Sequence, residues 1–147
     1  MATKSKSLTL LKSLDGQAVS FPIELALKRL DGSTVKVTIT CEAHGKRAWS
    51  KIKQRHIDAL LARAKAHQEQ QDQADDDSPA NVRRLEEAIE EAIVLESRLV
   101  QEFATGWSLS DDFTLENLQE LEDRFGNALD QLIKAYDKAV YQGQLGN

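Results

Sequence analysis

Two runs of strictly alternating apolar residues in the first third of the chain restrict its fold more than any other feature. Period-two alternation of this length is typical of β-strands that bury one face. Asp31-Gly32 lies between the runs, so the sequence predicts an antiparallel hairpin. The apolar positions are Phe21, Ile23, Leu25 and Leu27 in the first run, and Val35, Val37, Ile39 and Cys41 in the second.

The apolar pattern also selects the register of this hairpin. A two-residue turn at Asp31-Gly32 would place Leu27 opposite Lys36, and so set each apolar side chain against a polar one. A three-residue loop, Leu30-Asp31-Gly32 with Gly32 in the left-handed conformation, places Leu27 opposite Val35 and closes one buried face. We therefore expect the second register, with the further pairs Leu25–Val37, Ile23–Ile39 and Phe21–Cys41.

A weaker repeat suggests an additional strand before the hairpin. Residues 12–19 resemble residues 28–35, including the Asp-Gly pair. The same turn chemistry would pair Ser7–Ser13 with the residues from Gln17 onward, which gives a three-stranded meander. Leu8, Leu10 and Leu11 fit this pattern less cleanly, so a start without regular structure is the alternative.

From Lys46 the apolar period changes to three or four residues, which indicates helices. A polar segment at 68–80 separates two apolar stripes, so two long amphipathic helices within 46–105 are expected to form an antiparallel hairpin, the second starting near Ser78-Pro79 and ending at Gly106. The first stripe contains Trp49, Ile52, His56, Leu60 and Ala64, flanked by Ile57 and Leu61. The second contains Val82, Leu85, Ile89, Ala92, Leu99 and Phe103, interrupted by Glu96.

Residues 106–147 form a C-terminal helical segment in this interpretation. Trp107–Phe113 is a loop, Asp112 or Thr114 caps a third helix, Gly126-Asn127 interrupts it, and a last helix ends at Gly143. A chain of 147 residues has the size of one domain. Strands followed by helices predict an α+β fold for residues 1–147, with a small antiparallel hairpin or meander in 1–45 and a mainly helical remainder.

The sequence lacks the phosphate loop, dinucleotide fingerprint, nucleophile elbow and zinc-binding helix that mark common enzymes. We therefore expect no enzymatic activity, cofactor or metal site. Cys41 continues the buried face of its strand and is expected to be a core residue. His44, His56 and His67 are expected to be structural or exposed to solvent, and Asp75-Asp76-Asp77 to be solvated, because calcium loops need alternating ligands and a turn glycine.

No membrane partner is expected either, because no window approaches the ~18 consecutive apolar residues of a membrane span. Met1–Lys12 also lacks the apolar block of a signal peptide, which favours a cytoplasmic protein.

Charge is distributed unevenly along the chain. Residues 1–67 hold 13 of the 19 Lys and Arg but 5 of the 24 Asp and Glu, and the remaining residues hold the rest. The basic side chains of the first helix could bind nucleic acid, or could pack beside the acidic second helix. We favour the internal or inter-subunit pairing, because the whole chain carries a formal charge of −5. These basic residues are Lys46, Arg47, Lys51, Lys53, Arg55, Arg63 and Lys65.

Six of the eight aromatic residues lie beyond residue 102. Trp107 and Phe113 flank a segment rich in Ser and Asp, where large aromatic side chains are less expected. They either pin this loop to the core, which we favour, or form a partner site.

The segment Gly106–Leu118 resembles the C-terminal part of phage tail assembly chaperones. It has Gly-Trp, then an acidic-Phe loop, then a helix that opens Thr114-Leu115-Glu116-Asn117. The similarity continues through Leu121, Phe125, Ala128, Ile133, Tyr136 and Ala139 to Gly146-Asn147. The strand pair Phe21–Cys41, followed by a helix opening near Lys46-Arg47, is similar too. The resemblance covers roughly residues 19–70 and 98–147, and the polar middle of the chain departs from it.

The resemblance implies a non-catalytic role in a bacterial host cytoplasm during phage or prophage tail assembly. Such proteins bind the aggregation-prone tape measure protein, and often tail tube subunits, while the tube polymerises. The expected partner-binding residues are Trp107, Leu109 and Phe113 of the loop, and Leu85, Ile89, Leu99 and Phe103 of the second helix. The alternatives are a nucleic-acid-binding or regulatory protein that acts through helix 46–65, and a structural tail protein. Self-association is left open.

Overall fold

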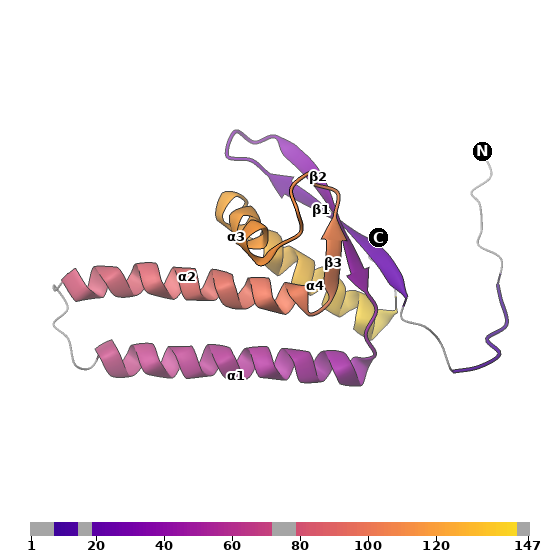
Figure 1. The fold of residues 1–147 in the computed structure, drawn as a ribbon, viewed down its shortest axis with the longest axis horizontal. Coiled ribbons are helices and arrows are strands. Elements are labelled where there is room, and N and C mark those ends of the chain that lie inside the picture. The colour runs from indigo at the N-terminus through magenta and orange to yellow at the C-terminus, as the bar shows by residue number, and fades with distance from the viewer. Residues whose placement is uncertain (1–7, 15–18, 72–78, 144–147) are drawn as a thin grey trace.

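The computed structural model describes residues 8–14, 19–71 and 79–143, and Figure 1 shows their arrangement. Within these ranges a three-stranded antiparallel sheet and four helices form the α+β fold that the sequence predicts. The elements are β1 (Ser20–Lys28), β2 (Thr34–Glu42), α1 (Lys46–Gln71), α2 (Pro79–Gln101), β3 (Ala104–Trp107), α3 (Leu115–Arg124) and α4 (Ala128–Gln142).

β1 and β2 form a hairpin in the register predicted from the apolar pattern. Leu27 pairs with Val35, and the pairing continues to Phe21 and Cys41. Gly32 closes the three-residue loop with φ +89°, and the Arg29 N–H donates to the Ser33 carbonyl at 2.8 Å. Six inward-facing residues of the two strands are buried, and Phe21 and Val35 at the ends are half-buried. Cys41 is among the buried ones, which confirms its place in the core.

The third strand corrects two sequence-based expectations. Residues 8–13 form no strand, and the partner Gln17 onward falls partly outside the described residues. The strand that joins β2 is instead β3, and α2 ends at Gln101 rather than at Gly106. The Glu42 N–H donates to the Phe103 carbonyl at 2.7 Å, so the free edge of β2 recruits a segment whose Thr, Gly and Trp favour a helix weakly.

α1 and α2 lie side by side and antiparallel, as predicted, and we call this pair the arm. Figure 1 shows that the end of the arm extends beyond the sheet, α3 and α4. Arg63 pairs with Glu91 at 2.8 Å, and Arg55 with Glu102 at 3.9 Å. The basic helix therefore packs beside the acidic one, which confirms the internal charge pairing. The connection that includes Asp75-Asp76-Asp77 lies outside the described residues.

α4 crosses the inner face of the sheet and joins it to the arm through a cluster of aromatic side chains. Tyr136 of α4 is fully buried. Its ring stacks on Phe103 at 4.0 Å and meets Trp49 edge to face at 4.8 Å between ring centroids. Its hydroxyl accepts a hydrogen bond from the His44 N–H and donates one to the Glu42 carbonyl. One side chain thus connects α1 and the turn after α2 to the end of β2.

The two C-terminal helices start at different kinds of cap. The Thr114 hydroxyl accepts from the Asn117 N–H at 3.1 Å, so Thr114 is the cap of α3. Asn127 precedes α4 with φ 72° and makes no side-chain cap bond. The Glu122 carboxylate replaces it by accepting from the N–H groups of Asn127 and Leu129. A negative charge at this helix N-terminus also interacts favourably with the helix dipole.

Glu96, which interrupts the apolar stripe of α2, lies near two other carboxylates. Its partial burial, followed by the charges of Glu122 and Asp130, raises its pKa above the ordinary value. When the pKa of a carboxyl group is higher in the folded protein than in the unfolded chain, the free energy of unfolding falls as the pH rises through that pKa. The ionised form of Glu96 at neutral pH is therefore unfavourable for folding. Glu96 therefore weakens the junction of α2, α3 and α4.

Glu96→Gln is expected to raise the free energy of unfolding at pH 7 by about 0.5 kcal/mol after solvent screening. The gain should disappear when the pH is lowered through the range where Glu96 becomes protonated. Urea denaturation at several pH values measures both effects. Glu90→Gln, at an exposed site of the same helix, is the matched control and should change neither. A loss of stability in Glu96→Gln at neutral pH would contradict the expectation.

Candidate functional site

The chemistry of the described residues points to binding surfaces. The described part of the chain contains no group of His, Cys, Asp or Glu that could hold a metal ion. Burial raises the pKa of the Cys41 thiol to about 12, so the thiol is not an available nucleophile. His44 and His67 are bound to neighbouring groups, the first to the Glu102 carbonyl and the second to the Glu91 carboxylate, each at 2.8 Å.

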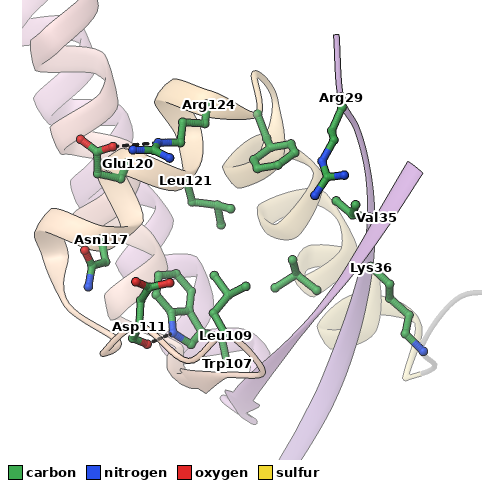
Figure 2. A pocket seen from close by; sticks show the side chains of 12 residues that line it. Arg29, Val35, Lys36, Trp107, Leu109, Asp111, Asn117, Glu120, Leu121 and Arg124 are labelled. Atoms are coloured by element: carbon green, nitrogen blue, oxygen red, sulfur yellow. Dashed lines mark hydrogen bonds and ion pairs between the residues drawn. The ribbon is translucent and has the colours of Figure 1, made fainter. Parts of the chain in front are cut away.

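A cavity of about 400 Å³ opens between the tip of the β1–β2 hairpin, the loop after β3, and α3. We call it the hairpin pocket (Figure 2). Its apolar lining comes from Val35, Val37, Trp107, Leu109, Leu121 and Phe125. Its polar lining comes from Arg29, Lys36, Asp111, Asn117, Glu120 and Arg124.

Trp107 is held in the wall of this pocket by its own loop. Its indole N–H donates to the Asp111 carbonyl at 2.7 Å, and its ring meets Phe113 edge to face at 5.1 Å. Ser108 fastens the loop to β2, because its hydroxyl accepts from the Thr38 N–H and its own N–H donates to the Thr38 carbonyl. The aromatic residues therefore pin the loop, as favoured from the sequence, while the partly exposed Trp107 ring still faces the pocket.

Charges of both signs surround the apolar lining. Figure 2 shows the Arg29 side chain entering the pocket from the hairpin, while Lys36 extends away from it. Arg124 pairs with Glu120 at 3.1 Å, and Lys36 pairs with Glu24 at 3.6 Å. A lining with equal numbers of apolar and polar residues can accept an apolar side chain and orient the chain that carries it.

The second surface is an apolar stripe on the part of the arm that extends beyond α3 and α4. Ile57 and Leu61 follow Lys53 at four-residue intervals, and Lys53 contacts Asp137 of α4. On α2, the stripe that is buried at Leu99 and Val100 continues outward. At 3.6 residues per turn, both stripes fall on the same side of the arm. We call this surface the arm face; its residues, each 40–64% exposed, are Ile57, Leu60, Leu61, Leu85 and Ile89.

The residues expected to bind a partner are thus divided among three places. Trp107 and Leu109 line the hairpin pocket, and Phe113 supports the Trp107 ring. Leu85 and Ile89 lie on the arm face, about 24 Å and 18 Å along α2 from its end at Gln101, at about 1.5 Å per residue. Leu99 and Phe103 are buried in the core, where they contact the chain's own residues.

Sequence reasoning did not identify the remaining lining of the pocket. Arg29, Leu121 and Arg124 come from separate segments that meet only because β3 joins the sheet. Ile57 and Leu61 were recognised as flanking an apolar stripe. Their exposure could have been predicted from length, because the apolar stripe of the first helix is longer than the two short C-terminal helices can cover.

Comparison with known families identifies the chain. A family model described as phage tail assembly chaperone matches residues 1–147. The chain therefore belongs to the phage tail assembly chaperone family, which confirms the resemblance seen at Gly106–Leu118 and includes the polar middle of the chain as well. Comparisons with curated proteins and with solved structures found no match. Among the described helices, none is long and apolar enough to cross a membrane.

Proposed function

We propose that this tail assembly chaperone binds the tape measure protein, and tail tube subunits, in the host cytoplasm while the tail is built. Membership of the family carries the proposal, since it implies a role in tail assembly that is not enzymatic. The described surface supports it, because both candidate sites are apolar and of the kind that binds polypeptide segments.

The hairpin pocket is the proposed anchor point for a client. A volume of about 400 Å³ accommodates one or two large apolar side chains. Trp107 supplies a rigid aromatic wall, which is the residue type that most often dominates binding energy at protein interfaces. Arg29 and Asp111 at the edge can bond the client backbone or its charged residues, and so fix its direction.

The arm face is the proposed second contact. Two neighbouring helices that present apolar stripes on one side form a groove for an amphipathic helix, which completes a three-helix arrangement. Leu85 and Ile89 lie four residues apart on α2 and are the proposed contacts of this groove. Leu61 of α1 contributes nearer the root of the arm, since its neighbour Arg63 pairs with Glu91. Such a surface shields an apolar client segment without enclosing it, so release needs no large rearrangement of the chaperone.

Trp107→Ala is expected to weaken binding to the tape measure protein at least tenfold, because it removes the largest apolar side chain that lines the pocket. Co-expression and co-purification establish the complex, and titration calorimetry measures the change. Because Trp107 also holds its loop, Leu109→Asp provides an independent change within the same pocket. Unlike Trp107, Leu109 has no side-chain hydrogen bond that holds the loop. The new carboxylate would lose its water on contact with an apolar client, which disfavours binding.

Leu30→Ala is the matched control, since Leu30 is fully exposed at the hairpin tip and does not line the pocket. It should bind as the wild type does. Wild-type affinity in both Trp107→Ala and Leu109→Asp would refute the pocket as the client site. The absence of any complex between the wild-type chain and the tape measure protein would refute the proposed function itself.

A further inference from the structure

Residues 8–14 carry four leucines that the described part of the chain leaves uncovered. Leu8, Leu10, Leu11 and Leu14 are each at least 75% exposed, and the segment has no helix or strand. Side chains of this size strongly favour removal from water. Four of them within seven residues form an apolar segment of the kind that marks an interaction site.

The spacing of these leucines fits a helix. At 100° per residue, positions 8, 10, 11 and 14 fall within an arc of about 160°. Thr9, Lys12 and Ser13 then lie on the opposite side. A segment without its own secondary structure can become helical when it binds, because the partner surface supplies the burial that a short helix lacks in water.

The arm face has the complementary properties. It offers five apolar side chains on two parallel stripes, with Glu86 and Glu90 of α2 along its border at helical spacing. The first fourteen residues of the chain contain Lys4, Lys6 and Lys12 and no acidic residue. Apolar contacts provide the affinity in such a pairing, and opposite charges set its orientation.

We infer that residues 8–14 of one copy pack as a short helix on the arm face of a second copy, so that the chaperone without client is a dimer. Each copy has one such segment and one such face. Mutual exchange therefore uses both pairs and closes with two-fold symmetry rather than growing into a filament.

A copy's own arm face is the less suitable receptor. The Val19 carbonyl accepts from the Ala43 N–H at 2.7 Å, which fixes the start of the segment near the beginning of α1. Five residues from Val19 to Leu14 span at most about 18 Å, so Leu14 does not reach Leu61 of its own copy, which lies about 22 Å along α1 from Lys46. At the root of the arm the direct route is covered by α4, where Asp137 bonds Lys53 at 2.7 Å. In Figure 1 residues 8–14 lie on the side of the molecule opposite the far end of the arm.

Sedimentation of the chain alone, over a range of concentrations, tests this inference independently of any client. The wild type should be a dimer. Leu8→Ser/Leu11→Ser in the segment and Leu85→Ser/Ile89→Ser on the arm face should each raise the dimer dissociation constant at least tenfold. Circular dichroism serves to check that each variant is folded. Leu30→Ser is the control, because Leu30 is an exposed leucine that lies outside both the segment and the arm face. It should leave the dissociation constant unchanged.

Mixing the two double variants distinguishes exchange between copies from any effect within one copy. The mixture contains one intact segment and one intact arm face on different chains, so it should form a heterodimer that neither variant forms with itself. A monomeric wild type, a dimer that both double variants retain, or a mixture that stays monomeric would each overturn the inference. Because no client is present, these outcomes leave the proposed binding of the tape measure protein untouched.

Discussion

Replacing Tyr136 with alanine is expected to lower the free energy of unfolding by about 4 kcal/mol, the usual cost of deleting a buried aromatic ring. Tyr136 has no exposed surface. Its ring stacks on Phe103 and on Phe21, and Trp49 meets it edge to face. Its loss would leave a cavity where α4, the arm and the sheet meet.

The hydroxyl of Tyr136 adds a separate contribution. Burial raises its pKa above the ordinary value, so it stays protonated and continues to donate to Glu42. Tyr136→Phe keeps the ring but leaves the Glu42 carbonyl and the His44 N–H without this partner, which should cost about 1 to 2 kcal/mol.

Urea denaturation of the two Tyr136 variants separates the ring from the hydroxyl. Tyr141→Phe is the matched control, because Tyr141 lies on the same helix, is partly exposed, and bonds the Ser50 hydroxyl at the surface. It should change the free energy of unfolding by less than about 0.5 kcal/mol. A similarly small effect of Tyr136→Ala would show that the aromatic cluster does not hold the elements together.

Trp49→Ala is expected to cost about 3 to 5 kcal/mol and to act mainly on the arm. Trp49 is fully buried near the start of α1, with its ring edge on to Phe103 at 5.4 Å. Its indole N–H donates to the Asp137 carboxylate at 2.9 Å. The described contacts between α1 and α4 are confined to this end of the helix, at Trp49, Ser50 and Lys53. Removal of the indole therefore weakens the attachment of the whole helix.

Hydrogen exchange measures where Trp49→Ala acts, and urea denaturation measures how much. Amide protection should fall along α1 and α2 more than in β1 and β2. Ile57→Ala is the matched control, since Ile57 lies on the same helix but is exposed on the arm face. Equal stability losses in Trp49→Ala and Ile57→Ala would contradict the assignment of Trp49 as the anchor of the arm.

The hairpin could be predicted in detail because its information is local. Side chains alternate across a strand, so a register shift of one residue would have exposed every apolar residue from Phe21 to Cys41. β3 could not be predicted in this way. Its four residues are too few to show alternation. They form a strand because the free edge of β2 is available for pairing, as Gly106 pairs with Thr40.

The candidate sites were only partly accessible for a related reason. Helical periodicity identifies which side of α2 is apolar, and this placed Leu85, Ile89, Leu99 and Phe103 correctly on one stripe. It does not indicate how far along that stripe other elements reach. Other elements bury Leu99 and Phe103 at the root of the arm but leave Leu85 and Ile89 exposed further out.

The order of the strands makes the arm an insertion within the sheet. β2 precedes the arm and β3 follows it, yet Ile39 and Trp107 are paired neighbours. The loop-closure entropy for joining such distant segments is reduced if α1 and α2 associate first, because their ends then bring both strands together. Completion of the hairpin pocket therefore depends on the pairing of two helices that do not line it. A defect at the tip of the arm would slow maturation of this site during folding, although it contacts none of the residues there.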